Sequence, residues 1–154
     1  MRLVVQRVKN ASVSVEKKIV GKIDCGLLVL VGVREGDTIE DADYLAEKLV
    51  KLRVMADENG KMNLSVKDLP AQAGIGGSLL VVSQFTLYAD TSGGNRPSFV
   101  KAANPDAAKD IYDHLVNNLR KSGIDIETGS FGDYMEINSV LDGPVTIIVD
   151  SKDK

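Results

Sequence analysis

The chain has 154 residues, of which 44% are hydrophobic and 27% are charged, and its formal net charge is −3. The length and composition predict a water-soluble protein folded as one domain over residues 1–154. The slightly acidic balance argues against a general nucleic-acid binder with a broad basic face, although a local basic patch remains compatible with it.

The rare residue types exclude several kinds of site. The only cysteine, Cys25, permits no internal disulfide, and with a single histidine the chain offers no ligand set for structural zinc. No apolar run reaches the roughly 18 residues that span a bilayer, and the alternating N-terminus is unlike a signal peptide. We therefore expect a cytoplasmic protein in which Cys25 lines the core rather than acts as a reactive thiol.

The first part of the chain predicts β-strands. Residues 2–8 alternate between apolar and polar side chains, as in a half-buried strand. Residues 12–16 and 19–24 predict a hairpin around Lys17-Lys18. Residues 27–33 are almost all apolar, which indicates a strand buried on both faces.

The apolar period then changes to that of a helix. Thr38 and Asp41 are spaced for a capping box at its start. The apolar positions that follow are Ile39, Ala42, Leu45, Ala46, Leu49 and Leu52. Residues 53–66 predict short strands about the tight turn Asp57–Gly60.

The second half begins with a predicted strand at Ser78–Leu87 and a polar, glycine-rich loop at 90–96. Asn104 and Pro105 predict the N-cap and first turn of a second helix, and Gly123 predicts its end. The apolar stripe of this helix consists of Ala108, Ile111, Tyr112, Leu115 and Leu119.

Three further strands are predicted at 124–128, 134–140 and 145–149. Many strands with only two helices predict a mixed α/β fold. We expect two packed, mostly antiparallel or mixed sheets in a barrel-like arrangement, with both helices on one side.

Ordinary hydrolytic machinery is hard to assemble from this sequence. The only histidine, His114, lies within the second helix among the polar neighbours Asp110, Asp113 and Asn117, so it is predicted to face solvent. A Ser-His-Asp or Cys-His site is therefore not expected. None of the 22 acidic residues forms a pair in an obvious catalytic setting.

Two short motifs carry the most functional information. Ser83–Leu87 reads Ser-Gln-Phe-Thr-Leu, and Asp142–Thr146 contains Gly143-Pro144; each lies at the end of a strand-like run. Taken alone, the first motif could be an ordinary strand end and the second an ordinary turn. Together and in this order, they resemble the two signature motifs of the D-aminoacyl-tRNA deacylases.

The resemblance covers essentially the whole chain. Further segments that resemble the family are Met1–Val8, Ala11-Ser12-Val13, Gly26–Val33, Arg96–Phe99 and Glu127–Gly132. One position departs from the family pattern: Leu141 stands where the family usually has Asn. Any polar contact from that Asn is therefore missing or replaced here.

The resemblance implies an enzyme that hydrolyses the ester bond of D-aminoacyl-tRNA, and also of mischarged glycyl-tRNA, without a metal or organic cofactor. Ser83, Gln84, Phe85 and Thr86 would form one wall of the catalytic pocket. In the family the Phe85 N–H faces the oxyanion, and the RNA 2′-hydroxyl assists the reaction. One such backbone donor is worth about 3 kcal/mol of transition-state stabilisation. Thr86, which has no base beside it in sequence, is assigned a structural or pocket role.

The other wall would come from Gly143-Pro144 of a partner subunit, so the resemblance implies a homodimer. The family's Gly-Pro bond is cis, whereas sequence alone would predict trans. Its carbonyl groups would hold the substrate α-amine, and its backbone would exclude an L side chain. The expected surroundings of the site are Arg7, Arg96, Pro97, Ser98 and Phe99.

Three alternatives stay open at this point. The fold could serve a non-catalytic nucleic-acid-binding protein, a related deacylase acting on an L-aminoacyl mischarge, or a dimeric scaffold. The tRNA partner could be met through a patch formed by Lys17, Lys18, Lys22, Lys48, Lys51 and Arg53.

Overall fold

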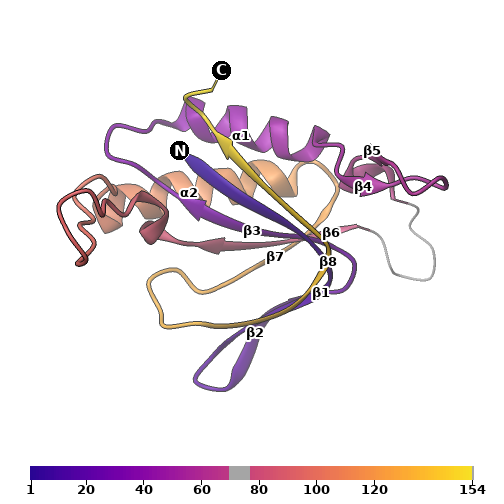
Figure 1. Cartoon of the computed structure of the whole chain (residues 1–154), viewed down its shortest axis with the longest axis horizontal. Helices are drawn as coiled ribbons and strands as arrows, with labels where there is room; N and C mark the ends of the chain where they lie inside the picture. Colours follow the sequence, from indigo (N-terminus) through magenta and orange to yellow (C-terminus); the bar gives the residue numbers. More distant parts are fainter. Residues whose placement is uncertain (70–76, 154) are drawn as a thin grey trace.

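The computed structural model of the chain describes residues 1–69 and 77–153. These residues form one six-stranded sheet, one two-stranded sheet and two α-helices on the same side of the larger sheet (Figure 1). The elements are β1 (Arg2–Val15), β2 (Lys18–Ile23), β3 (Gly26–Gly32), α1 (Ile39–Lys51), β4 (Met55–Ala56), β5 (Met62–Leu64), the 3₁₀ turn η1 (Val66–Asp68), β6 (Ser78–Ser83), the 3₁₀ turn η2 (Phe85–Tyr88), α2 (Pro105–Arg120), β7 (Asp125–Thr128) and β8 (Glu136–Asp150).

The larger sheet has the order β2-β1-β3-β6-β7, and β8 pairs with β1. β1 is antiparallel to β2, β3 and β8, whereas β3, β6 and β7 run parallel to one another. The first half of β1 pairs with β3 and its second half with β2, so the sheet curls and carries β2 across β6 and β7. The predicted barrel-like mixed fold is confirmed, and its two packed layers are the two halves of this curled sheet.

The central strands are apolar on both faces because each face covers a different core. Val29 and Val81 point to the helices, while Leu28 and Leu80 point to the second half of β1 and to β2. All four are nearly inaccessible to solvent. The prediction of a strand buried on both faces at 27–33 is therefore confirmed.

Both helices begin where their caps predict. The Thr38 N–H donates to the Asp41 carboxylate at 3.0 Å, and the Asn104 side chain accepts from the Ala107 N–H at 3.0 Å. The two helices pack against each other and against one apolar cluster on the sheet. Neither is long and apolar enough to cross a membrane.

Two strand boundaries differ from the prediction. Residues 2–8 and all but the last of 12–16 belong to the single strand β1, and residues 134–140 and 145–149 fall largely within the single strand β8. Bulges in the β1–β8 ladder let both strands bend without ending. The polar residues that suggested breaks in the sequence therefore mark irregularities within continuous strands.

The strand predicted at Ser78–Leu87 ends at Ser83. The Gln84 N–H still donates to the Val31 carbonyl, at 2.7 Å, and the chain then turns into η2. η2 packs directly on Gly32, where an added Cβ would lie 3.0 Å from the Leu87 Cβ. The missing side chain at Gly32 thus permits a turn that the local sequence does not indicate.

The largest irregularity lies in the middle of β8. Gln6 pairs with Thr146 and Val8 pairs with Leu141, so the single residue Arg7 of β1 faces the four residues 142–145 of β8. These four residues, which include the second motif, form a bulge that protrudes from the ladder; we call it the β8 bulge.

Candidate active site

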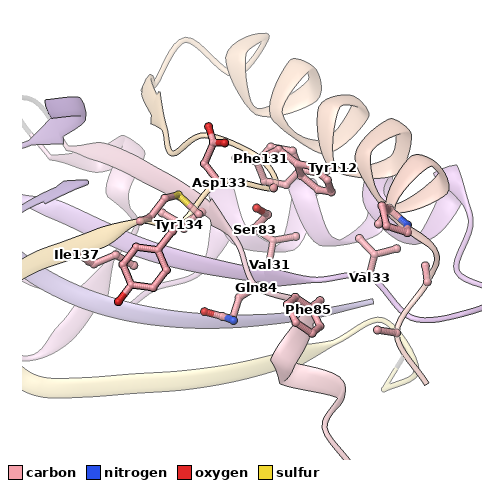
Figure 2. Close-up of a pocket in the computed structure, with 17 residues that line it drawn as sticks. Val31, Val33, Ser83, Gln84, Phe85, Tyr112, Phe131, Asp133, Tyr134 and Ile137 are labelled. Carbon is pink, nitrogen blue, oxygen red and sulfur yellow. The ribbon is translucent and has the colours of Figure 1, made fainter. Parts of the chain in front are cut away.

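A cavity of about 630 Å³ opens at the carboxyl end of β6 (Figure 2). It lies between the end of β3, the start of α2 and the segment that joins β7 to β8. Its lining residues are Val31, Val33, Val82, Ser83, Gln84, Phe85, Ala102, Ala103, Pro105, Ala108, Tyr112, Phe131, Gly132, Asp133, Tyr134, Met135 and Ile137.

Three residues of the first motif, Ser83, Gln84 and Phe85, line this cavity. Ser83 and Gln84 are half-buried, whereas Phe85 keeps 57% of its surface exposed. The Phe85 ring packs edge-on against Phe99, with ring centroids 5.0 Å apart. Phe85 is thus a wall of the cavity and not part of the core.

The backbone N–H of Phe85 makes no hydrogen bond within its own 3₁₀ turn. Phe85 is the first residue of η2, and the first N–H groups of a helix have no acceptor within it. Thr86, the next residue, is exposed, and its hydroxyl accepts a hydrogen bond from the Gln84 side chain at 2.5 Å. That bond joins two motif side chains, which fits a structural part for Thr86.

The described lining of the cavity contains no histidine or lysine. His114 lies elsewhere, between α1 and α2, with its Nε2 atom 2.6 Å from the Asp43 carboxylate. Asp133 is the one carboxylate among the described lining residues, and it accepts a hydrogen bond from the Ser130 hydroxyl. Figure 2 shows the Asp133 carboxylate directed away from Ser83 and Phe85.

Tyr112 is also poorly placed to act as a base. Burial raises the pKa of its phenol well above the ordinary value, and the hydroxyl donates to the Val81 carbonyl at 2.9 Å. Among the described residues, no cluster of three or more His, Cys, Asp or Glu side chains could hold a metal ion.

The β8 bulge lies outside this cavity. The Gly143–Pro144 peptide bond is cis, as the family resemblance implies, and both residues are exposed. Gly143 has a φ of 133°, a conformation that L side chains rarely adopt, and an added Cβ would lie 2.8 Å from the Val145 amide nitrogen. Glycine is therefore the residue that this position requires.

Arg7 holds the base of the bulge. Its Nε donates to the Asp142 carbonyl at 3.1 Å and lies 3.0 Å from the Asp142 carboxylate. Its Nη1 donates to the Val54 carbonyl, just before β4, at 2.8 Å. Because the Arg7 side chain is only 12% exposed, these contacts are well shielded from water.

The same contacts account for the support of the bulge despite Leu141. The Leu141 side chain is 43% exposed and its backbone pairs with Val8, so it continues the ladder up to the bulge. The polar support of the bulge comes instead from Arg7.

Cys25 lies close enough to Asp142 and Arg7 to sense their charges. Burial, and then the Asp142 carboxylate, raise the pKa of the thiol, while Arg7 lowers it. The net rise keeps the thiol protonated at neutral pH, so Cys25 does not have the properties of a nucleophile.

The remaining predicted site residues lie on the loop that precedes α2. Arg96, Pro97 and Ser98 are exposed and do not line the cavity, whereas Phe99 contacts Phe85. Ser98 and Asp90 exchange two backbone hydrogen bonds, of 2.8 and 2.9 Å, and thereby close the loop. A hydrogen bond from Lys101 holds the pKa of the Asp90 carboxyl well below its usual range.

Several lining residues were missed by sequence reasoning. The sequence places Tyr112 only in the apolar stripe of the second helix and Tyr134 and Ile137 only in a strand, and it gives no role to Asp133. Phe131 lies within Glu127–Gly132, a segment noted only for its family resemblance. That segment was the available signal, but nothing local in it indicates contact with the end of β6.

Several large apolar side chains of β8 and the segment before it are exposed. Ile137, Val140, Leu141 and Ile148 are 38–66% exposed, and Tyr134, just before the strand, is 89% exposed. Within the described residues β8 pairs with β1 alone, so its other edge has no strand beside it. Such an edge is suited to covering by another chain.

Comparison with known proteins gives a consistent result. A family model described as D-Tyr-tRNA(Tyr) deacylase matches residues 4–150. A curated D-aminoacyl-tRNA deacylase of Bacillus licheniformis is 57% identical over 152 residues, which are 99% of this chain and 99% of that protein. One of Thermosipho africanus is 55% identical over 152 residues, covering 99% and 98% of the two chains.

Solved structures share the fold over nearly the whole chain. A protein described as "c-Myc DNA Unwinding Element Binding Protein" has a TM-score of 0.86 and 38% identity, and the match covers 97% of this chain and 98% of that one. A structure described as that of "a probable eukaryotic D-amino acid tRNA deacylase" has a TM-score of 0.79 with the same coverage. At 17% identity, the second shows the fold alone.

Proposed function

The chain belongs to the D-Tyr-tRNA(Tyr) deacylase family and is a D-aminoacyl-tRNA deacylase, a hydrolase of translation proofreading; we propose how its residues perform this hydrolysis. The assignment is carried by identity of 55–57% to curated deacylases along the full chain. The mechanism, the partner subunit and a cytoplasmic location, where aminoacyl-tRNA is used, are proposals.

We propose that the cavity at Ser83–Phe85 receives the aminoacylated 3′ end of tRNA. The Phe85 N–H would donate to the carbonyl oxygen of the ester as negative charge develops on it. Water would attack the ester carbonyl carbon, the bond to the 3′-oxygen of the terminal ribose would break, and the proton released by the water would pass to that oxygen with the vicinal 2′-hydroxyl assisting. Holding the ester in place supplies several more kcal/mol. The absence of histidine and lysine from the described lining supports a reaction that does not depend on a protein base.

The β8 bulge would complete the site from a partner subunit. Gly143 and Pro144 are exposed and lie outside the cavity of their own chain, while that cavity is open. The exposed apolar side chains of β8 and its unpaired edge support an isologous homodimer, in which each bulge enters the other subunit's cavity. The carbonyl groups of the bulge would bind the substrate α-amine, and its backbone would exclude an L side chain.

The activity is tested with matched tRNAs charged with D-tyrosine, L-tyrosine or glycine, in the presence of a chelator. We expect rapid loss of the D-tyrosyl and glycyl esters, with the L-tyrosyl ester spared. Each tenfold preference corresponds to about 1.4 kcal/mol. Equal hydrolysis of the D and L esters would contradict the exclusion mechanism.

The shared site is tested by mixing subunits. One variant, Phe85→Pro, damages the cavity; the other, Gly143→Ala, damages the bulge. In a heterodimer one site carries both defects and the other carries neither, so two inactive proteins should together regain roughly a quarter of the wild-type activity if they mix at random. No regained activity in a verified heterodimer would place both motifs in one subunit's site.

A second candidate is nucleic-acid binding without catalysis, which the description of the similar DNA-unwinding-element binding protein favours. It predicts tight binding of uncharged nucleic acid and no ester hydrolysis. The charged-tRNA assay above separates the two functions, because only the deacylase releases the amino acid.

A further inference from the structure

A second hollow lies on the outer side of α1, at its C-terminal end. It has a volume of about 440 Å³ and lies near the strands β4 and β5, which Figure 1 shows next to that end of the helix. We call it the α1 groove; its lining residues are Tyr44, Glu47, Lys48, Lys51, Leu52 and Arg53.

The charges of the α1 groove favour an anionic ligand. Lys51 pairs with Glu47 at 2.5 Å, but both side chains are about 70% exposed, and such a surface pair is weak enough for a phosphate to replace it. Lys48 has no ion-pair partner within residues 1–69 and 77–153. Three cations and one carboxylate thus meet in one hollow of a chain whose net charge is −3.

Arg53 is held in position by two uncharged acceptors. Its Nε donates to the Asn63 backbone carbonyl at 2.7 Å, and its Nη2 donates to the Asn63 side-chain oxygen. Both acceptors are uncharged and Arg53 forms no ion pair among the described residues, although the Asp68 carboxylate lies close enough to interact with its charge. An oriented guanidinium is well suited to binding phosphate oxygens.

The α1 groove is connected to the β8 bulge by a short series of contacts. Arg53 precedes Val54, whose carbonyl accepts the hydrogen bond from Arg7, and Arg7 in turn holds Asp142 at the base of the bulge. The groove therefore lies on the side of the subunit from which the bulge is supported.

We propose that the α1 groove binds backbone phosphates in the acceptor arm of the substrate tRNA. The inference rests on the proposed function: when the 3′ end occupies the cavity of one subunit, the bulge that closes this cavity brings the partner's α1 groove near the arm. The apolar wall at Leu52 and the Tyr44 ring would contact the sugars, and the cations would contact the phosphates.

The other candidate lysines lie elsewhere. Lys17 and Lys18 are at the turn between β1 and β2, which Figure 1 shows at the bottom of the view, well away from the C-terminal end of α1. The six basic residues predicted from sequence therefore do not form one patch; three of them, Lys48, Lys51 and Arg53, share the α1 groove.

The test compares two substrates and two double variants. The substrates are full-length D-tyrosyl-tRNA and the D-tyrosyl ester of a CCA trinucleotide, which reaches the cavity but has no acceptor stem. The variants are Lys48→Gln with Lys51→Gln, and a matched control, Lys18→Gln with Lys22→Gln, which removes the same charge from β2. Melting temperatures verify that both proteins fold.

We expect the groove variant to lose roughly tenfold in kcat/KM on tRNA at low salt, and less than about twofold on the trinucleotide ester. A plot of log kcat/KM against log salt concentration has a negative slope. The magnitude of this slope should decrease by about 2 in the groove variant, one for each phosphate contact removed. The control should lose less than about twofold on either substrate. Equal losses on both substrates, no loss on tRNA, or the same loss in the control would each overturn the proposal.

Failure of the proposed function gives a different result. If the wild-type protein cleaves neither ester, the proposed function fails. Binding of uncharged tRNA by the wild type and both variants then tests whether the α1 groove binds phosphates. Weaker binding by the groove variant alone would support the phosphate site; equal binding by all three would overturn it.

Discussion

The two signature segments are built in opposite ways. Ser83–Phe85 ends a strand buried on both faces and lines a cavity formed by its own subunit. The β8 bulge is exposed, lines no described cavity, and is held from behind by Arg7. The first segment forms part of a cavity, and the second protrudes from the surface. Two chains related by a twofold axis could satisfy both, so the difference between the segments is itself an argument for a dimer.

The largest expected effect comes from removing the backbone donor of the cavity. Phe85→Pro deletes the N–H at the first position of η2, where proline is otherwise tolerated. We expect kcat for D-tyrosyl-tRNA to fall roughly 10²–10³-fold below that of Phe85→Ala, which loses the ring but keeps the donor. Equal rates for the two variants would show that the Phe85 amide does not contact the oxyanion.

The corresponding variant for the β8 bulge is Arg7→Ala. It removes the contacts to Asp142 and Val54, so the bulge loses its fixed position. A displacement of about 1 Å costs on the order of 100-fold in rate, and we expect a loss of kcat/KM of that size. Arg7→Lys keeps the charge but not the planar guanidinium. Its kcat/KM should lie between those of the wild type and Arg7→Ala. Full activity of Arg7→Ala would mean that the bulge is rigid by itself.

Asp133→Asn tests whether a side chain of the cavity acts as a base. It removes the one carboxylate of the described lining and leaves the shape nearly unchanged. Because the carboxylate faces away from Phe85, we expect kcat/KM on D-tyrosyl-tRNA to change by less than about threefold. A loss of several hundredfold, together with a lost limb of the pH–rate profile, would identify Asp133 as a base.

The smallest effect is expected at Cys25, beside the bulge. Since its pKa is raised in the folded chain, folding favours the thiol, and the stability that it contributes is lost as pH rises through the folded pKa. Between about pH 8 and pH 10 the wild-type melting temperature should therefore fall slightly more than that of Cys25→Ser. Activity at neutral pH should be unchanged, and strong inactivation of Cys25→Ser would give the thiol a direct part.

Local signals predicted the helices well because their causes are local. The Thr38–Asp41 box and the Asn104 cap are contacts between residues three apart, and both exist in the folded chain. The alternation that buries Leu28 and Val29 on opposite faces is equally visible in sequence.

The misplaced boundaries have distant causes. Ser83 ends β6 because η2 packs on Gly32, a residue some fifty positions earlier. The strand β8 continues through Asp142–Val145 because Arg7, from the other end of the chain, holds the bulge. In the same way, nothing near Asp133 or Tyr134 indicates that they reach the end of β6, so the cavity could be predicted only in part.

The spacing of residues along β8 matters as well as their identity. β8 carries Ile137, which lines the cavity of its own subunit, and, six positions later, Gly143 of the bulge. Deleting one residue between them would turn every side chain before the deletion to the opposite face of the strand, without altering any residue assigned to the site. An insertion or deletion between Ile137 and Gly143 should therefore abolish activity, whereas one in the turn Asp57–Gly60, which carries no residue assigned to the site, should be tolerated.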